Sequence, residues 1–132
     1  MLTIFMNLTL KRLEKAIRNS WGRDTCYYKF IWDDKNQPES AGHCRVVALI
    51  VNDYFGGEIL FSHVVGNPKY THYWNRLPNK KEVDFTKDQF SKNLKLTSPK
   101  IVSRKQVLDN KIIGRSYPIL KKMVVKFIKE YY

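Results

Sequence analysis

The sequence predicts an α+β fold in which helices pack against one small antiparallel sheet. Three observations predict it. Apolar residues recur every three to four positions over residues 8–21, a twelve-residue apolar segment at 44–55 ends at a Gly-Gly pair, and three short segments of strand-like composition follow. A chain of 132 residues with 43% hydrophobic content is long enough to bury one core, so we expect a single domain over residues 1–132.

Two helices are expected in the first half. In residues 8–21, Leu13, Ile17 and Trp21 share one face, lysines and arginines occupy the other, and Gly22 follows as a stop. Residues 44–55 are apolar on all sides, which predicts a central buried helix, although their β-branched content favours a strand. Residues 23–40, between the two, have no clear periodicity and are expected to form a connection of functional interest.

Three strands and two further helices complete the expected fold. Residues 58–65, 70–77 and 82–86 are typical of strands. Ser103 is a suitable N-cap for a short helix to Asp109, and residues 117–132 carry an apolar stripe typical of a longer one. We therefore divide the domain into a core over residues 7–90 and a basic C-terminal helical part over residues 91–132.

Charge is concentrated in that last part. The chain has 24 Lys and Arg against 12 Asp and Glu, and residues 91–132 hold 11 of the basic but only 2 of the acidic residues. Such a segment attracts nucleic acid or an acidic protein partner non-specifically. Tyr117, Tyr131 and Tyr132 are interleaved with its lysines.

Composition also excludes several classes. The hydrophobic content excludes a disordered chain, and two cysteines are too few for a disulfide scaffold. No segment approaches the roughly 20 apolar residues of a membrane span, and the apolar start Met1–Met6 lacks the features of a signal peptide. We expect a cytoplasmic protein with reduced thiols and no membrane partner.

Cys44, His72 and Asp84 are the candidate catalytic residues. Cys44 opens the predicted central helix, where free N–H groups and the helix dipole favour a thiolate and can stabilise an oxyanion. His72 and Asp84 lie in consecutive predicted strands. A nucleophile, a base and a carboxylate that orients the base are the components of a Cys-His-Asp hydrolase or acyltransferase.

The turn after Leu77 decides whether His72 and Asp84 can meet. A three-residue loop, Pro78–Lys80, pairs Trp74 with Asp84 and places His72 and Asp84 on one face of the sheet as diagonal neighbours. A two-residue loop moves Asp84 to the opposite face. Pro78 cannot donate to the strand ladder and therefore belongs in the loop, which favours the first register.

Several supporting residues are weaker candidates. The side-chain amides of Asn36 and Gln37 could supply a second oxyanion donor, and Trp32 and Trp74 could line a substrate groove. Each has a simpler interpretation, as a turn residue or a packed aromatic. A zinc site is disfavoured because the candidate ligands match no common spacing, so neither metal nor cofactor is expected. Those ligands would be Cys26, Cys44, His63 and His72.

Local sequence blocks add a resemblance. Gly42-His43-Cys44, Asn52-Asp53-Tyr54-Phe55-Gly56-Gly57, His72-Tyr73-Trp74-Asn75 and Val83-Asp84-Phe85-Thr86 together resemble the YunG-like family of small bacterial proteins. The His-x-Trp block with a following Asp is also similar to transglutaminase-like and other papain-like proteins. The resemblance implies a papain-like core with Cys44, His72 and Asp84 in the catalytic positions. His43 stands where that pattern has glutamine, so a hydrogen bond toward substrate would come from a ring nitrogen.

The expected function is that of a cysteine hydrolase or acyltransferase acting on a peptide, isopeptide or side-chain amide. Cys44 would attack the acyl carbon, His72 would move the proton, and Asp84 would hold the imidazole. The alternative is a non-catalytic binding module on the same fold, with the basic residues 91–132 as its interface to nucleic acid or an acidic protein.

Overall fold

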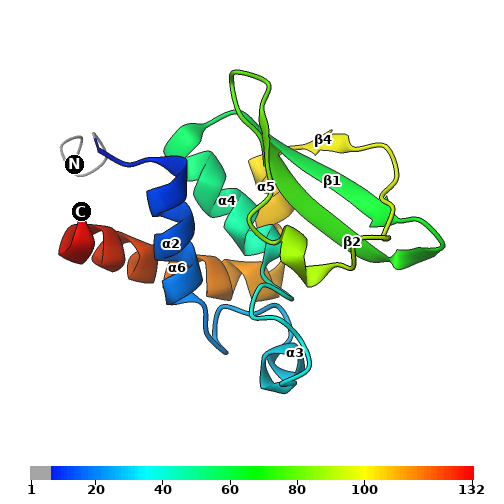
Figure 1. The fold of residues 1–132 in the computed structure, drawn as a ribbon, viewed down its shortest axis with the longest axis horizontal. Helices are drawn as coiled ribbons and strands as arrows, with labels where there is room; N and C mark the ends of the chain where they lie inside the picture. Colours follow the sequence, from blue (N-terminus) through cyan, green and yellow to red (C-terminus); the bar gives the residue numbers. More distant parts are fainter. Residues whose placement is uncertain (1–6) are drawn as a thin grey trace.

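A computed structural model describes residues 7–132, and the N-terminal segment Met1–Met6 lies outside the described residues. The fold is α+β, with a four-stranded antiparallel sheet in the order β3-β2-β1-β4 (Figure 1). The elements in chain order are α2 (Leu10–Ser20), α3 (Lys29–Asp33), α4 (Cys44–Phe55), β1 (Glu58–Val64), β2 (Asn67–Arg76), β3 (Glu82–Val83), η1 (Lys87–Gln89), β4 (Lys100–Val102), α5 (Arg104–Leu108) and α6 (Lys111–Tyr131).

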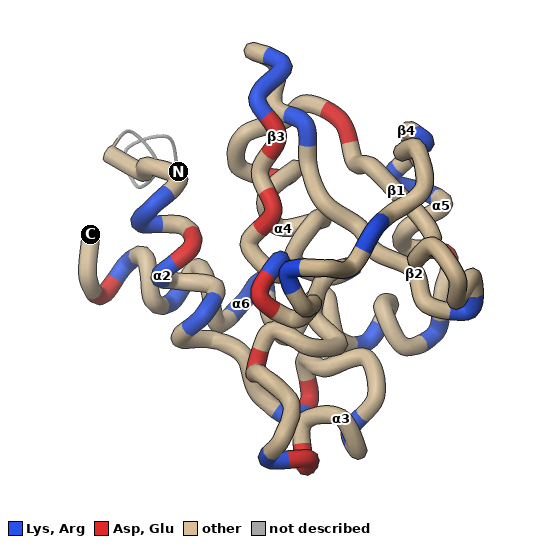
Figure 2. Tube along the Cα trace, turned by 45° about the vertical axis from the view of Figure 1, so that its right-hand side comes forward, with Lys and Arg blue, Asp and Glu red and all other residues tan. Residues whose placement is uncertain are grey.

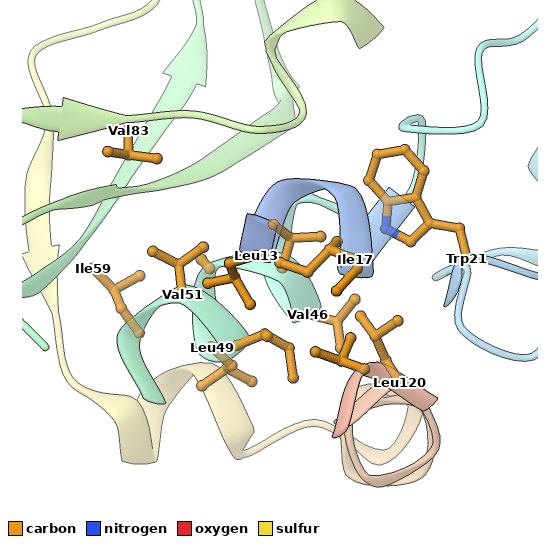
Figure 3. Close-up of a cluster of buried hydrophobic side chains, with 14 of the residues drawn as sticks. Leu13, Ile17, Trp21, Val46, Leu49, Val51, Ile59, Val83 and Leu120 are labelled. Carbon is orange, nitrogen blue, oxygen red and sulfur yellow. The ribbon is translucent and has the colours of Figure 1, made fainter. Parts of the chain in front are cut away.

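The hydrophobic core surrounds α4. This helix lies between the sheet and the pair α2 and α6, and side chains from all these elements meet in one cluster (Figure 3). Leu13 and Ile17 of α2 contribute to it, as does Leu120 of α6, and all three are completely buried. Because α4 is covered on both sides, its apolar residues need no polar face, which explains the continuous apolar sequence.

The predicted bounds of α4 are confirmed at both ends, and those of α2 differ by only a few residues. Thr9 caps α2 by accepting a hydrogen bond from the N–H of Arg12. Gly56 and Gly57 follow α4 with positive φ angles. A Cβ at Gly57 would lie 2.2 Å from the carbonyl oxygen of Arg76, so the close approach of the chain to β2 requires glycine there.

The β2–β3 turn has the predicted three-residue loop. Asn75 pairs with Val83 and Arg76 with Glu82, and the N–H of Leu77 donates to the carbonyl of Lys81. Lys80 adopts the left-handed conformation, φ 72°, which is typical of the last residue of such a loop. The register that places His72 and Asp84 on one face is therefore the observed one, although β3 is shorter than predicted.

The C-terminal part differs from its expected all-helical character. Residues 100–102 form β4, which pairs with the outer edge of β1, and α6 begins at Lys111 rather than at 117. The side chain of Asn110 caps α6 by accepting from the N–H groups of Ile112 and Ile113. Residues 91–132 thus complete both the sheet and the core and are not an appendage to residues 7–90.

No helix within residues 7–132 is both long enough and apolar enough to cross a membrane.

Candidate functional site

Cys44 is the first residue of α4, and its side chain is partly exposed. As the first helical residue it has a backbone N–H with no partner inside the helix. The next residue fixes this end of the helix, because the Arg45 guanidinium donates to the carbonyls of Gln106 and Val107 in α5. The thiol and the free N–H are therefore presented from a rigid helix start.

His72 lies in the middle of β2, opposite Ser62 of β1, and is completely buried. Its Nε2 is 2.6 Å from Oδ2 of Asp84. The other oxygen of Asp84, Oδ1, accepts hydrogen bonds from the N–H and the hydroxyl of Thr86. The carboxylate is thus held on both oxygens, and it fixes the imidazole through one ring nitrogen.

The pKa of His72 is raised from its ordinary 6.5 to about 9. Burial acts to lower this pKa. The hydrogen bonds of His72 to Asp84 and to the Cys44 side chain, together with the electrostatic interaction with both groups, raise the pKa by more than burial lowers it. Near neutral pH the ring therefore carries its extra proton. The structure thus brings Cys44 and Asp84 to the same imidazole, that of His72.

Aromatic rings enclose the imidazole. Trp74, two residues further along β2, stacks on His72 with ring centroids 5.4 Å apart, and Phe90 meets it edge-on at 4.7 Å. The indole N–H of Trp74 donates to Glu82. Trp74 is buried, so it does not line a substrate groove as predicted. Its ring instead fixes the plane of the histidine ring.

Gln89 is a residue that the sequence analysis missed. It ends η1, and its side-chain amide lies 3.3 Å from Nδ1 of His72 and donates to the hydroxyl of Thr86. Since Nε2 is bonded to Asp84, Nδ1 is the ring nitrogen left for proton transfer, and the Gln89 amide lies against it. A lone glutamine after a strand gives no recognisable sequence signal, because the fold alone brings it to the histidine.

Arg18 of α2 holds the segment that carries Asp84 and Gln89. Its guanidinium donates to the carbonyl of Phe85 and pairs with Asp88, and it also pairs with Glu14 one helical turn away. An irregular segment gains little from its own backbone hydrogen bonds, so this anchor to a core helix helps to fix it.

Two cavities lie near the candidate residues, one lined by His72 itself and the other by its neighbours Gln89 and Phe90. The smaller, about 530 Å³, is lined by His72 and Asp84 together with charged residues such as Arg18, Lys87 and Lys92. The larger, about 720 Å³, reaches Gly42, two residues before Cys44, and Gln89. We call the larger one the aromatic groove; its lining includes Tyr28, Phe30, Val65 and Tyr70.

His43 does not have the predicted role toward substrate. It is completely buried between Trp21, which stacks on it at 5.0 Å, and Trp32, which meets it edge-on. Its Nε2 lies 2.8 Å from the Thr25 hydroxyl, and its Nδ1 has no hydrogen-bond partner among the described residues. Burial lowers its pKa to about 4. His43 is therefore a neutral packing residue.

The remaining candidates are separated by the fold. Trp32 is half-buried against His43 and the core rather than in the aromatic groove. Asn36 is exposed, and its backbone N–H donates to the Asp34 side chain. Asn36 is therefore a turn residue, the simpler of its two interpretations. Gln37 lies in the lining of the aromatic groove and stays a candidate for contacting substrate.

No group of three or more His, Cys, Asp and Glu side chains within residues 7–132 is arranged to hold a metal ion. Of the four zinc candidates, His63 bonds to the carbonyl of Pro68, and Cys26 is a buried free thiol whose Sγ lies 3.4 Å from the carbonyl of Ala41. A Cβ at Gly42 would lie 2.5 Å from that sulfur. The absence of a side chain at Gly42 therefore leaves the space that the Cys26 side chain occupies.

The basic residues of the last third are distributed over several elements (Figure 2). Lysines and Arg115 form the exposed face of α6, but Lys121 is paired with Asp53. The hydroxyl of Tyr117 donates to the same carboxylate, so this tyrosine is tied to α4.

The family model described as YunG protein matches residues 9–129. The comparisons with curated proteins and with solved structures found no match.

Proposed function

The chain belongs to the YunG family, and from that premise we propose that it is a papain-like cysteine hydrolase or acyltransferase that uses Cys44, His72 and Asp84. The observation that carries the proposal is geometric: His72 is completely buried, with its Nε2 2.6 Å from the Asp84 carboxylate and its ring beside the helix start that presents Cys44, and its raised pKa agrees with this arrangement. A buried histidine with only a structural role is expected to become neutral, as His43 does. A raised pKa beside a cysteine is the condition that maintains a nucleophilic sulfur.

The reaction has two halves. The Cys44 thiolate attacks the carbonyl carbon of an amide, and the electron pair moves to the carbonyl oxygen, which the backbone N–H of Cys44 can stabilise. The carbon–nitrogen bond then breaks while Nδ1 of His72 gives its proton to the leaving amine. A thioester remains on Cys44.

The thioester is resolved by a second nucleophile. Water or an amine attacks the same carbon, His72 accepts the proton released, and the thiolate of Cys44 leaves. Asp84 keeps Nε2 as the donor throughout, so Nδ1 stays the nitrogen that exchanges protons. Peptide, isopeptide and side-chain amide donors all fit this chemistry, with the product set by whether water or an amine attacks.

The chain contains its own control for the first test, because it has two cysteines in different environments. With iodoacetamide at pH 6, we expect Cys44 to be alkylated at least about tenfold faster than glutathione, since an ordinary thiol is almost entirely protonated there. Cys44→Ala should abolish this rapid labelling, and Cys26→Ala should retain it because burial raises the pKa of the Cys26 thiol. Mass spectrometry of the labelled peptides measures both rates.

An alkylation rate for Cys44 no higher than that of glutathione would contradict the proposal. In that case the exposed basic face of α6 favours the alternative, a binding module for nucleic acid or an acidic protein. Its affinity for an oligonucleotide would then fall steeply with salt concentration, with a log–log slope of about −0.7 to −0.9 per phosphate contacted.

A further inference from the structure

We propose that the aromatic groove binds an uncharged aromatic or aliphatic side chain of the acyl donor and so selects its substrates. This inference rests on the proposed function, because it names the substrate class of the same site. It is carried by the composition of the groove, by its position and by its lack of charge.

The groove gathers exposed apolar side chains. Nine large apolar side chains are exposed in the part of the chain that the structure describes, and four of them line this one cavity. Phe30 is 69% and Tyr70 63% exposed, and Phe30 stacks on Tyr28 at 5.2 Å. Exposed apolar side chains that converge on one hollow mark a binding site more often than the same number scattered singly.

The groove lies next to the candidate catalytic residues. One part of its lining is Ala41 and Gly42, which lead directly into Cys44, and another is Gln89, which bonds to His72. A peptide whose scissile carbonyl reaches the Cys44 sulfur can therefore place a neighbouring side chain in the groove. The opposite wall comes from the β1–β2 turn, at Val64–Asn67.

Its lack of charge distinguishes the groove from the rest of the surface. None of the residues within 7–132 that line it is charged, although the chain carries a formal net charge of +12. The smaller cavity, by contrast, is lined by Arg18, Asp84, Lys87, Asp88 and Lys92. A charged substrate side chain would lose hydration in the aromatic groove without gaining an ion pair, whereas an apolar one gains from leaving water.

The experiment uses peptidyl chloromethyl ketones that alkylate Cys44. Otherwise identical probes carry Phe, Glu or Lys at the first or second residue before the reactive carbon, with glycine at the other position. At one of the two positions we expect the Phe probe to inactivate Cys44 about ten- to a hundredfold faster than the Glu and Lys probes, the range that one buried side chain can supply.

Three exposed substitutions test whether the groove is responsible. Phe30→Ser and Tyr70→Ser should each reduce the preference for the Phe probe at least about threefold. Ile101→Ser, on β4 and similarly exposed at 60%, should leave it unchanged because Ile101 does not line the groove. All three positions are on the surface, so loss of folding is not expected.

Iodoacetamide separates this inference from the proposed function, because it has no side chain to place in the groove. If iodoacetamide alkylates Cys44 rapidly and the Phe probe shows no preference, or a preference that Phe30→Ser and Tyr70→Ser leave intact, the groove assignment is wrong and the catalytic proposal stands. If iodoacetamide itself reacts slowly with Cys44, the catalytic proposal fails and the groove assignment fails with it.

Discussion

The chain contains two completely buried histidines whose surroundings shift their pKa values in opposite directions. His43 packs between Trp21 and Trp32 with the Thr25 hydroxyl as a partner, no charged group in the described part of the chain shifts its pKa, and burial lowers that pKa to about 4. His72 also stacks on a tryptophan, but a carboxylate and a thiol face its ring, and its pKa is raised to about 9. Burial disfavours the charged form at both sites, so the difference comes from the groups that face the nitrogens.

The comparison identifies Asp84 as the residue that separates the two environments. With Asp84→Asn, which preserves the shape of the side chain, His72 keeps its burial and loses the adjacent negative charge. We expect its pKa to fall below 6.5, and the rate of Cys44 alkylation at pH 6 to fall at least about tenfold, because the thiolate loses its imidazolium partner. Titration of the His72 ring by NMR measures the pKa directly.

Asp33→Asn is the matched control for that substitution. Asp33 is an exposed carboxylate that pairs with Arg23 and not with His72. It should change neither the pKa of His72 nor the alkylation rate by more than about twofold. An Asp84→Asn variant in which His72 still titrates near 9 would show that Asp84 does not cause the raised pKa.

The two histidines should also shape the pH dependence of stability. The raised pKa of His72 contributes stability that is fully present below pH 6.5 and is lost as the pH rises through 9, in total about 3 kcal/mol. The lowered pKa of His43 makes stability depend on pH in the opposite direction. Between pH 6.5 and 4 the unfolded chain binds a proton that the folded chain does not, so stability falls with falling pH by up to about 3 kcal/mol.

We call the loss of stability between pH 6.5 and 4 the acidic limb of this profile, and the loss between pH 6.5 and 9 the alkaline limb. His43→Gln should remove the acidic limb and leave the alkaline limb unchanged. Glutamine has a similar length and no charge to gain on acidification. Denaturant unfolding at pH 4, 6.5 and 9 measures both limbs, and the comparison is between pH values within each variant, so a constant loss from altered packing cancels. An acidic limb that persists in His43→Gln would assign it to other groups.

The smallest effect is expected at Gln89, whose amide nitrogen lies 3.3 Å from Nδ1 of His72. An amide N–H can donate to Nδ1 only when the ring is neutral, so Gln89→Ala should favour the imidazolium and raise Cys44 alkylation at pH 6 by about two- to fivefold, the range of one modest hydrogen bond. Asn93→Ala, at an exposed position that lines neither cavity, is the control and should leave the rate unchanged. A fall in the rate of Gln89→Ala would instead show that Gln89 supports the ring.

Sequence patterns predicted the elements that carry the three candidate residues. The limits of α4 follow from a mostly apolar segment ended by two glycines, and the register of β2 and β3 follows from where Pro78 can lie. Both signals are local. The segment from Asp84 to Phe90 has no such periodicity, and Phe90 and Gln89 were missed because a non-repetitive segment is positioned by what it packs against.

His43 shows the limit of inference from position in the chain. Its place directly before Cys44 suggested a contact with substrate, but α4 begins at the next residue, and the turn before it directs the ring inward to Trp21 and Trp32. The direction of a side chain at a helix start depends on the backbone of the preceding turn, and no spacing rule fixes that.

The sequence by itself determined the α+β class, the central helix that begins at Cys44 and the pairing that brings His72 to Asp84, because hydrophobic periodicity and turn chemistry act over a few residues. Only the tertiary structure decided which histidine is charged, which glutamine reaches it and where the aromatic groove lies. These properties depend on residues from α2, α3, β2 and the 84–90 segment, which are distant in sequence and meet only when the chain is folded.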